Sequence, residues 1–333
     1  MLRFLLVATA LLAASAAPAG GTGGENSLTP GGAHAKLDGK GHMKPDGKFM
    51  LNSEMPKDDS KDPRLIHWMS EMRGNSMPVC NSTAMCWDSR ACEHESHALG
   101  WTGRTDVSNG WHVCFDVIKP KTAACRVVSI GLGGEFEFED EMTKLGCEVH
   151  AFDPTVELQE KHRAHAKANG WTFHPIGLAG SSGAVTDGSG NVYGHLDASS
   201  MLPLQDIFAL SFPDTPKNID YLKVDCEGCE WAALAHVKKT SPDLLKNVKQ
   251  LAFEIHMTPS YGVPAASDMT LALDFIEDSG FSIFRTFQNI GARRDRNKVP
   301  RFLHDAGWTM RVPNYMNDST AVPCCAEVHW VKR

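Results

Sequence analysis

From Arg126 to the C-terminus, short apolar runs alternate with amphipathic stretches of helical spacing. The runs of strand type are Arg126–Gly131, Cys147–Phe152, Trp171–Ile176, Ile219–Val224, Val248–Ile255, Phe281–Phe287 and Cys325–Val331. The helical stretches are Glu137–Leu145, Val156–Asn169, Glu230–Lys238 and Ser267–Ser279, and three of them stop at a glycine. This alternation predicts an α/β fold with a mostly parallel, seven-stranded sheet and helices on both faces. In such a fold the ligand lies beyond the carboxyl ends of the strands.

A glycine-rich loop follows the first predicted strand and contains Gly131, Gly133 and Gly134. Glycines allow a tight turn and a close approach of the backbone to a ligand. Asp153 ends the second strand, 20 residues after Gly133, where an acidic residue can accept hydrogen bonds from ribose hydroxyls. The segment therefore predicts a site for an adenosine-containing cofactor. The predicted cofactor-binding residues are Gly131, Gly133, Gly134, Glu135, Asp153, Pro154, Gly177 and Asp225.

The residues after this loop discriminate between adenosine cofactors. A dinucleotide site requires a third glycine in its G-x-G-x-x-G motif, and this chain has Phe136 at that position. The next helix opens with carboxylates that would repel a pyrophosphate: Glu135, Glu137, Glu139, Asp140 and Glu141. The same carboxylates also complement the positive end of the helix. S-adenosylmethionine (SAM) has no phosphate and carries a sulfonium and an ammonium, so the sequence favours SAM over a nicotinamide dinucleotide.

Two carboxylates, Asp225 and Glu227, come directly after the fourth predicted strand, and Gly228 provides the turn into the next helix. We expect both at the carboxyl end of a central strand. One carboxylate can bind the ammonium of SAM, and the other can orient or deprotonate an acceptor hydroxyl. The alternative is that Glu227 and Glu230 only cap the following helix.

The fifth predicted strand ends with Glu254 and His256 on the same face. His256 has the ordinary pKa of a general base near neutrality, so the predicted catalytic residues are Asp225, Glu227, Glu254 and His256. The alternative is that Glu254 and His256 satisfy buried polar groups at a strand end. The prediction includes no metal; a divalent ion held by the same four residues is the minor alternative. The fourth strand lacks a following Asn/Asp-Pro-Pro-aromatic turn, which favours O-methylation over amino-group methylation.

At these residues the chain resembles a known family. The segment Ile219–Asp225, followed by Glu227, Gly228 and Glu230, resembles the fourth-strand signature of FkbM-type methyltransferases. Further segments resemble the methyltransferase-like protein 24 family: Trp111–Cys114, Val128–Gly131, Glu135, Phe138, Val149–Pro154 and Phe173–Leu178. The resemblance covers about Asp62 to the C-terminus and implies a Rossmann-like class I methyltransferase fold that uses SAM. Departures from the signature are Cys226, Cys229 and a Gly/Ser-rich spacer, Ala179–Asp197. We expect the two cysteines to be packed or disulfide-bonded.

The N-terminal region has a different composition. Residues 1–17 have the apolar run and small residues of a secretory signal peptide, with an uncleaved signal anchor as the alternative. Residues 18–61 are polar and predicted to be a disordered linker. Residues 62–125, with helical spacing at Asp62–Gly74, are predicted to form a cysteine-rich helical collar before a methyltransferase domain at 126–333. Ten cysteines and sequons at Asn81 and Asn317 fit the secretory pathway, as a secreted or ER/Golgi-lumen protein. Residues 289–323 are long enough for a substrate lid.

The net charge of −7 offers no basic face for nucleic acid, and the first apolar run is short for a stable membrane span. The expected partner is therefore a small-molecule or glycan acceptor. Two other functions stay open at this point: a non-catalytic secreted binding protein on the same fold, and a nicotinamide-dependent oxidoreductase. Phe136 and the acidic loop disfavour the oxidoreductase. Gly131, Gly133, Asp153 and Asp225 disfavour the binding protein.

Overall fold

The computed structural model describes residues 41–43, 49–51, 62–73, 80, 83–86, 111–119, 125–180, 200–214, 218–256, 265–288, 293–295, 305–307, 321–323 and 325–332. All of them belong to one compact unit, Lys40–Arg333. The predicted signal peptide, both sequons, and most of the linker, the Gly/Ser-rich spacer and the predicted lid lie outside the described residues. Within the described part, no helix is both long and apolar enough to cross a bilayer.

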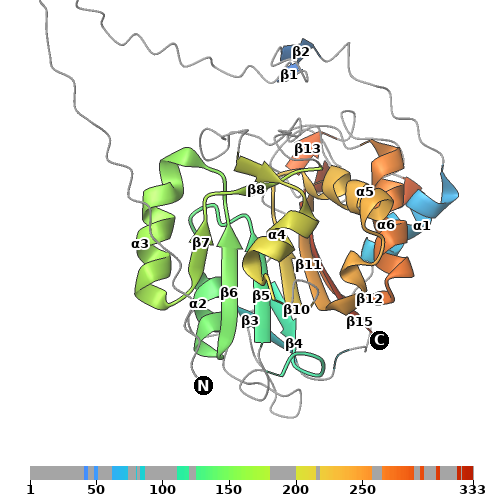
Figure 1. Ribbon diagram of the computed structural model, residues 1–333. Coiled ribbons are helices and arrows are strands. Elements are labelled where there is room, and N and C mark those ends of the chain that lie inside the picture. The colour runs from blue at the N-terminus through green and yellow to red at the C-terminus, as the bar shows by residue number, and fades with distance from the viewer. Residues whose placement is uncertain are drawn as a thin grey trace, which may run out of the picture. The chain divides into compact units, whose positions relative to one another are not determined.

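A seven-stranded sheet forms the centre of this unit, with the strand order β12-β15-β11-β10-β5-β6-β7 (Figure 1). Its strands are β5 (Cys125–Ile130), β6 (Cys147–Phe152), β7 (Thr172–His174), β10 (Ile219–Val224), β11 (Val248–His256), β12 (Phe281–Gln288) and β15 (Cys325–Lys332). The pairings among β7, β6, β5, β10 and β11 are parallel, whereas β15 runs antiparallel to both of its neighbours. The predicted mostly parallel α/β sheet is confirmed.

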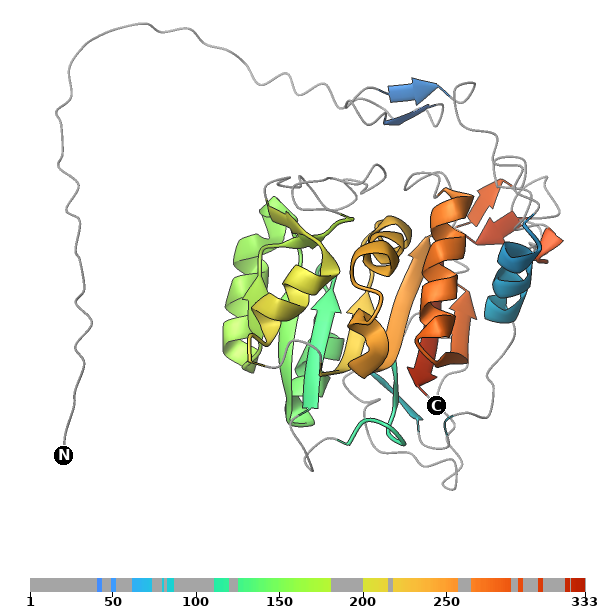
Figure 2. The same cartoon turned by 45° about the vertical axis from the view of Figure 1, so that its right-hand side comes forward.

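Both faces of the sheet are covered by helices (Figures 1 and 2). Successive side chains of a strand point to opposite faces, so Val127 and Val128 enter two different core clusters. The cluster of Val128 also contains residues from α1 (Pro63–Arg73), α4 (Leu204–Ser211), α5 (Glu230–Thr240) and α6 (Ala266–Asp278). The cluster of Val127 contains residues from α2 (Glu137–Lys144) and α3 (Gln159–Asn169). Burial on both faces explains why these strands read as nearly continuous apolar runs.

The segment 62–125 is less separate than the sequence indicates. Helix α1 forms where the helical spacing predicts it, but its Leu65, Met69 and Met72 are buried in the same core cluster as Val128. The proposed collar therefore shares its core with the sheet, because the apolar face of α1 needs a partner and meets α6 and β12. The rest of the segment contributes a two-stranded pair, β3 (Thr83–Cys86) with β4 (Trp111–Cys114).

Three further short strand pairs are separate from the main sheet. They are β1 (Gly41–Met43) with β2 (Phe49–Leu51), β8 (Gly177–Leu178) with β9 (Met201–Leu202), and β13 (Arg293–Asp295) with β14 (Ala321–Pro323). The first pair lies inside the predicted linker and the last inside the predicted lid. Two 3₁₀ turns complete the description, η3 (Val156–Leu158) before α3 and η5 (Leu244–Asn247) before β11.

Candidate functional site

The predicted site residues meet at the carboxyl ends of β5, β6, β10 and β11. The chain adds β6 and β7 on one side of β5, and then places β10 and β11 on its other side. The order of the strands thus reverses between β5 and β10, which lie side by side (Figure 1). This switch point is where open α/β sheets bind ligands, because the loops on either side diverge there.

Gly131 forms the junction between the two central strands. Its φ of +84° suits glycine, and an added Cβ would lie 1.6 Å from the carbonyl oxygen of Asp225. Two backbone hydrogen bonds fix this junction: Gly131 N donates to Phe152 O at 2.8 Å, and Asp225 N donates to Ile130 O at 2.8 Å. The glycine therefore allows the loops after β5 and β10 to touch, which no other residue would permit without moving the backbone.

Asp153, at the end of β6, holds the glycine-rich loop in place. Its Oδ2 accepts hydrogen bonds from Leu132 N at 2.9 Å and Gly133 N at 3.1 Å, and its Oδ1 accepts one from Thr155 N at 2.8 Å. Asp153 is only 3% exposed. A carboxylate has about four lone-pair sites, so three are in use. The sequence did not predict this loop-holding role, and the ribose contact of Asp153 stays a prediction.

A buried ion pair between β10 and α2 contacts the same loop. Lys223 Nζ donates to Gly131 O at 2.9 Å and lies 3.3 Å from Glu139 Oε1. Ser129 donates its hydroxyl to the same Glu139 oxygen at 2.5 Å. Lys223 and Glu139 are 4% and 0% exposed. Sequence reasoning missed this pair; the available signal was a lysine inside an apolar strand with a glutamate on the inward face of the next helix.

Phe136 occupies the position where a dinucleotide motif has its third glycine. Its ring is buried and stacks on His165 at a centroid distance of 4.2 Å, and it also contacts His162 and Trp171. The ring therefore packs α3 and the following turn against the loop. This packing explains the departure from the dinucleotide motif in structural terms.

The other predicted cofactor residues surround this loop. A Cβ on Gly177 would meet Met201 Sδ at 2.5 Å and Pro154 Cγ at 2.7 Å, so Gly177 and Pro154 pack together next to Asp153. The carbonyl of Gly134 accepts a hydrogen bond from Lys161 Nζ at 3.0 Å. Glu135 is exposed at the start of the following turn. Their contacts with a cofactor stay a prediction.

On the other side of Gly131, the predicted catalytic residues form a cluster. Val224 pairs with Phe253, and Glu254 pairs with Glu327, so Asp225, Glu254 and Glu327 lie in a row across β10, β11 and β15. His256 Nε2 lies 3.2 Å from Glu227 Oε2, and its Nδ1 lies 2.9 Å from Glu230 Oε1. Glu230 Oε1 also accepts a hydrogen bond from His256 N at 2.7 Å. Glu230 and Glu327 complete the cluster, and sequence reasoning gave neither a part in the reaction.

The charges of this cluster perturb one another strongly. Burial alone would lower the pKa of His256, but the carboxylates of Glu230 and Glu227 outweigh it and raise that pKa well above its usual value. Burial, followed by the charge of Glu254, raises the pKa of Asp225 well above its usual value. Burial also raises the pKa of Glu327 to about 8. Both ring nitrogens of His256 face carboxylates, an arrangement that does not suit the general-base role that the sequence predicts for it.

The loop that carries Glu227 is tightly constrained. A disulfide joins Cys226 to Cys229 across it, which confirms the prediction that these cysteines are packed or bonded. Glu227 adopts a φ of +57°, in the left-handed region that non-glycine residues rarely occupy. Strained backbone of this kind concentrates at functional sites. The loop thus directs the Glu227 carboxylate toward His256.

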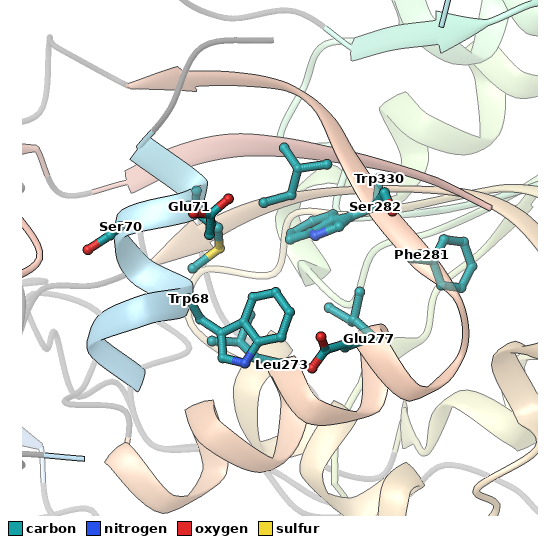
Figure 3. A pocket seen from close by; sticks show the side chains of 11 residues that line it. Trp68, Ser70, Glu71, Leu273, Glu277, Phe281, Ser282 and Trp330 are labelled. Atoms are coloured by element: carbon teal, nitrogen blue, oxygen red, sulfur yellow. The ribbon is translucent and has the colours of Figure 1, made fainter. Parts of the chain in front are cut away.

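A cavity of about 240 Å³ lies elsewhere, between α1, α6 and the outer strands (Figure 3). Trp68 on α1, Leu273 on α6 and Trp330 on β15 are among its lining side chains. Trp330 pairs with Leu251, which precedes Glu254 by three residues on β11. The cavity is therefore set back from the carboxyl ends of the strands, and its volume is below the range of about 300–1,000 Å³ typical of ligand sites.

Comparisons with known proteins identify the family that this chain resembles. Residues 88–300 match a family model described as a methyltransferase domain. "Probable methyltransferase-like protein 24" from Homo sapiens is 27% identical over 221 residues, covering 60% of this chain and 54% of the relative. The protein of the same name from Rattus norvegicus is 29% identical over 201 residues, covering 54% of this chain and 49% of the relative. This chain thus spans about half the length of the curated relatives that it matches. Among solved structures, an rRNA methylase from Streptococcus thermophilus has a TM-score of 0.32 at 14% identity, with 65% of this chain and 90% of that chain covered.

Proposed function

Because the chain belongs to the methyltransferase-domain family whose model matches residues 88–300, we propose that it transfers a methyl group from SAM to a hydroxyl oxygen of a glycan or small molecule. The observation that carries the proposal is the junction at Gly131. There the glycine-rich loop, held by Asp153, meets the Asp225 loop at the switch point of the sheet. A cofactor placed at this point lies against the backbone on one side and against carboxylates on the other.

The residues present fit SAM better than a dinucleotide. The glycine loop offers close backbone approach, and Asp153 and Pro154 stand at the end of β6, where the adenosine would lie. Asp225 has a buried Oδ1 that accepts no hydrogen bond among the described residues, so it can take the ammonium of the cofactor. The surrounding carboxylates favour a cation over a pyrophosphate. When bound, SAM supplies a methyl group on a positively charged sulfur.

The protein's own contribution is to position the acceptor and to receive its proton. Holding a hydroxyl in line with the methyl group supplies much of the rate, because a bimolecular encounter becomes an oriented one. A hydroxyl must also lose its proton as the new carbon–oxygen bond forms. In this proposal Glu254 accepts that proton, because both ring nitrogens of His256 already face the carboxylates of Glu227 and Glu230. In this proposal His256 orients Glu227 rather than acting as the base.

The compartment also belongs to this proposal. The described residues contain disulfides between Cys80 and Cys114, Cys125 and Cys147, and Cys226 and Cys229. Disulfides persist in oxidising compartments and are rare in the cytosol. We propose that the protein works in the secretory pathway, on a hydroxylated acceptor found there.

The test is transfer of a labelled methyl group. The purified chain is incubated with methyl-labelled SAM and separate pools of oligosaccharides and small hydroxylated molecules. The proposal predicts label in a product that resists alkali, because a methyl ether survives treatment that hydrolyses a methyl ester. An Asp225→Asn variant should transfer little label. Label that appears only on nitrogen, or on alkali-labile carboxyl groups, would overturn the O-methylation of a hydroxyl.

A further inference from the structure

The cluster around His256 has the arrangement of a metal site. Asp225, Glu227 and His256 each direct one ligand atom into a space in which these atoms lie within 4.8 Å of one another. The 3.2 Å between His256 Nε2 and Glu227 Oε2 matches the separation expected for two neighbouring ligands of one ion. Bonds of about 2.1 Å at a right angle place two ligand atoms about 3 Å apart.

The other nitrogen of His256 strengthens this interpretation. Metal-bound histidines almost always direct their second ring nitrogen to a carboxylate or carbonyl, which fixes the ring and its tautomer. Here His256 Nδ1 lies 2.9 Å from Glu230 Oε1, and Glu230 is 1% exposed. The backbone N–H of His256 donates to the same oxygen, so Glu230 is held in place. Nε2 is thereby directed toward Asp225 and Glu227.

A buried carboxylate, Glu327, lies next to the cluster. Glu327 is 3% exposed, and its Oε2 has no hydrogen-bond partner among the described residues. Asp225 and His256 are the charged groups that act on it. Among the described residues, no lysine or arginine forms an ion pair with Asp225, Glu227, Glu230 or Glu327. His256 is the ion-pair partner of Glu227 and Glu230, so Asp225 and Glu327 are the buried carboxylates of the cluster without an ion pair among the described residues. Buried charges are normally paired or bind metals, so these two carboxylates favour an added positive charge.

We propose that Asp225, Glu227 and His256 bind one divalent transition-metal cation, with Glu230 orienting His256. Carboxylate oxygens suit Mg²⁺, Ca²⁺ and Mn²⁺, whereas an imidazole nitrogen suits transition metals. A site with two carboxylate oxygens and one imidazole nitrogen therefore favours Mn²⁺ and related ions over Mg²⁺ or Ca²⁺. One oxygen of Asp225 is enough for the ion, which leaves the other for the cofactor. The ion would hold the acceptor hydroxyl, and this role, unlike the site itself, rests on the proposed function.

The test measures Mn²⁺ binding to the full chain after treatment with a chelator. Calorimetry should show one equivalent bound, and the electron spin echo of the bound Mn²⁺ should show coupling to an imidazole nitrogen. Glu227→Gln should weaken Mn²⁺ by at least about tenfold, and Glu230→Gln by about 10–100-fold through loss of the orienting carboxylate. The matched control is Glu160→Gln, whose side chain is 91% exposed on α3 and whose loss should leave binding unchanged.

The nitrogen coupling should disappear in His256→Gln. If His256→Gln fails to fold, the Mn²⁺ affinity of Glu227→Gln tests the site instead. The Glu227 side chain is 22% exposed, so this variant should fold. Mn²⁺ binding that is absent, or that is the same in Glu227→Gln as in the parent, would overturn the site. Binding of S-adenosylhomocysteine to the chelated protein is measured in parallel. Its loss would count against the proposed methyltransferase function, whereas loss of Mn²⁺ binding alone would count only against the metal.

Discussion

Lys223 places its ammonium nitrogen 2.9 Å from the carbonyl oxygen of Gly131, directly beneath the loop that follows β5. The same ammonium is paired with Glu139 of α2 in a region that is almost completely buried. Strand β10, helix α2 and the glycine loop are thus connected through one side chain. The stability of the fold and the shape of the proposed cofactor loop therefore depend on the same contact.

Replacing Lys223 alone should destabilise the protein strongly, because Glu139 would keep a buried charge without a partner. We expect Lys223→Met to lower the free energy of unfolding by about 3–5 kcal/mol in urea denaturation. The double variant Lys223→Met/Glu139→Gln should regain most of that loss. The control Lys238→Met breaks a surface pair with Asp278, whose side chain is 65% exposed, and should cost at most about 1 kcal/mol. A double variant as unstable as the single one would show that the pair is not the cause.

Two glycines with the same backbone angle allow a matched test of the junction. Gly131 and Gly170 both have a φ of +84°, but a Cβ would lie 1.6 Å from Asp225 O in the first case and 3.8 Å from Thr143 Cγ2 in the second. Gly170→Ala should cost about 1–2 kcal/mol in backbone strain and leave cofactor binding intact. Gly131→Ala should abolish binding or folding. Equal effects of the two variants, measured by thermal unfolding and calorimetry, would contradict the close contact.

Stability should decrease as the pH falls below about 6.5, the ordinary pKa of histidine. Burial, followed by the charge of His150, lowers the pKa of His174 to about 4, and the two rings are in contact at 3.0 Å. Since this folded-state pKa is below the unfolded one, the unfolded chain binds the proton first. The contribution of neutral His174 to the free energy of unfolding is therefore complete above about pH 6.5 and is lost as the pH falls toward 4. Urea unfolding at several pH values should show a shallower acid loss in His174→Gln, but not in a variant of the exposed His67. An unchanged pH dependence in His174→Gln would refute this role.

Removing the disulfide between Cys125 and Cys147 should destabilise the fold by about 3 kcal/mol, since it closes a segment with a sequence separation of 22 residues. The variant Cys125→Ala/Cys147→Ala tests this by thermal unfolding. Non-reducing peptide mapping of protein from a secretory host should recover this pair together with Cys80–Cys114 and Cys226–Cys229. Free thiols at these six positions would argue against the proposed compartment.

The sequence predicts the sheet well because the central strands are compact apolar runs, and β5, β6 and β10 are each followed directly by a glycine or an acid. Local pattern also places Gly131, Asp225 and His256 at strand ends, and parallel strands bring those ends together. The partner of a buried polar group is harder to predict, because strand periodicity gives its face but not what lies opposite. Glu139 looked like one of several acids at a helix start, and only packing shows that it faces Lys223.

Contacts distant in sequence were missed for the same reason. Helix α1 has a clear apolar face, but the sequence does not say that α6 covers it. Helix α4 and the strand pair β8–β9 escaped prediction because they flank a Gly/Ser-rich spacer with no clear periodicity. Asp153 was placed correctly at the end of β6, and its hydrogen bonds to Leu132 and Gly133 required the folded loop.

Calorimetric titration with S-adenosylhomocysteine tests the central claim most directly. The parent protein should bind one equivalent and should not bind NADH. Asp153→Ala should raise the dissociation constant at least about tenfold, because a charge-assisted acceptor worth about 1.5–3 kcal/mol is removed and the glycine loop is released. Absence of S-adenosylhomocysteine binding in the folded parent protein, with NADH bound instead, would contradict the assignment of this site to SAM.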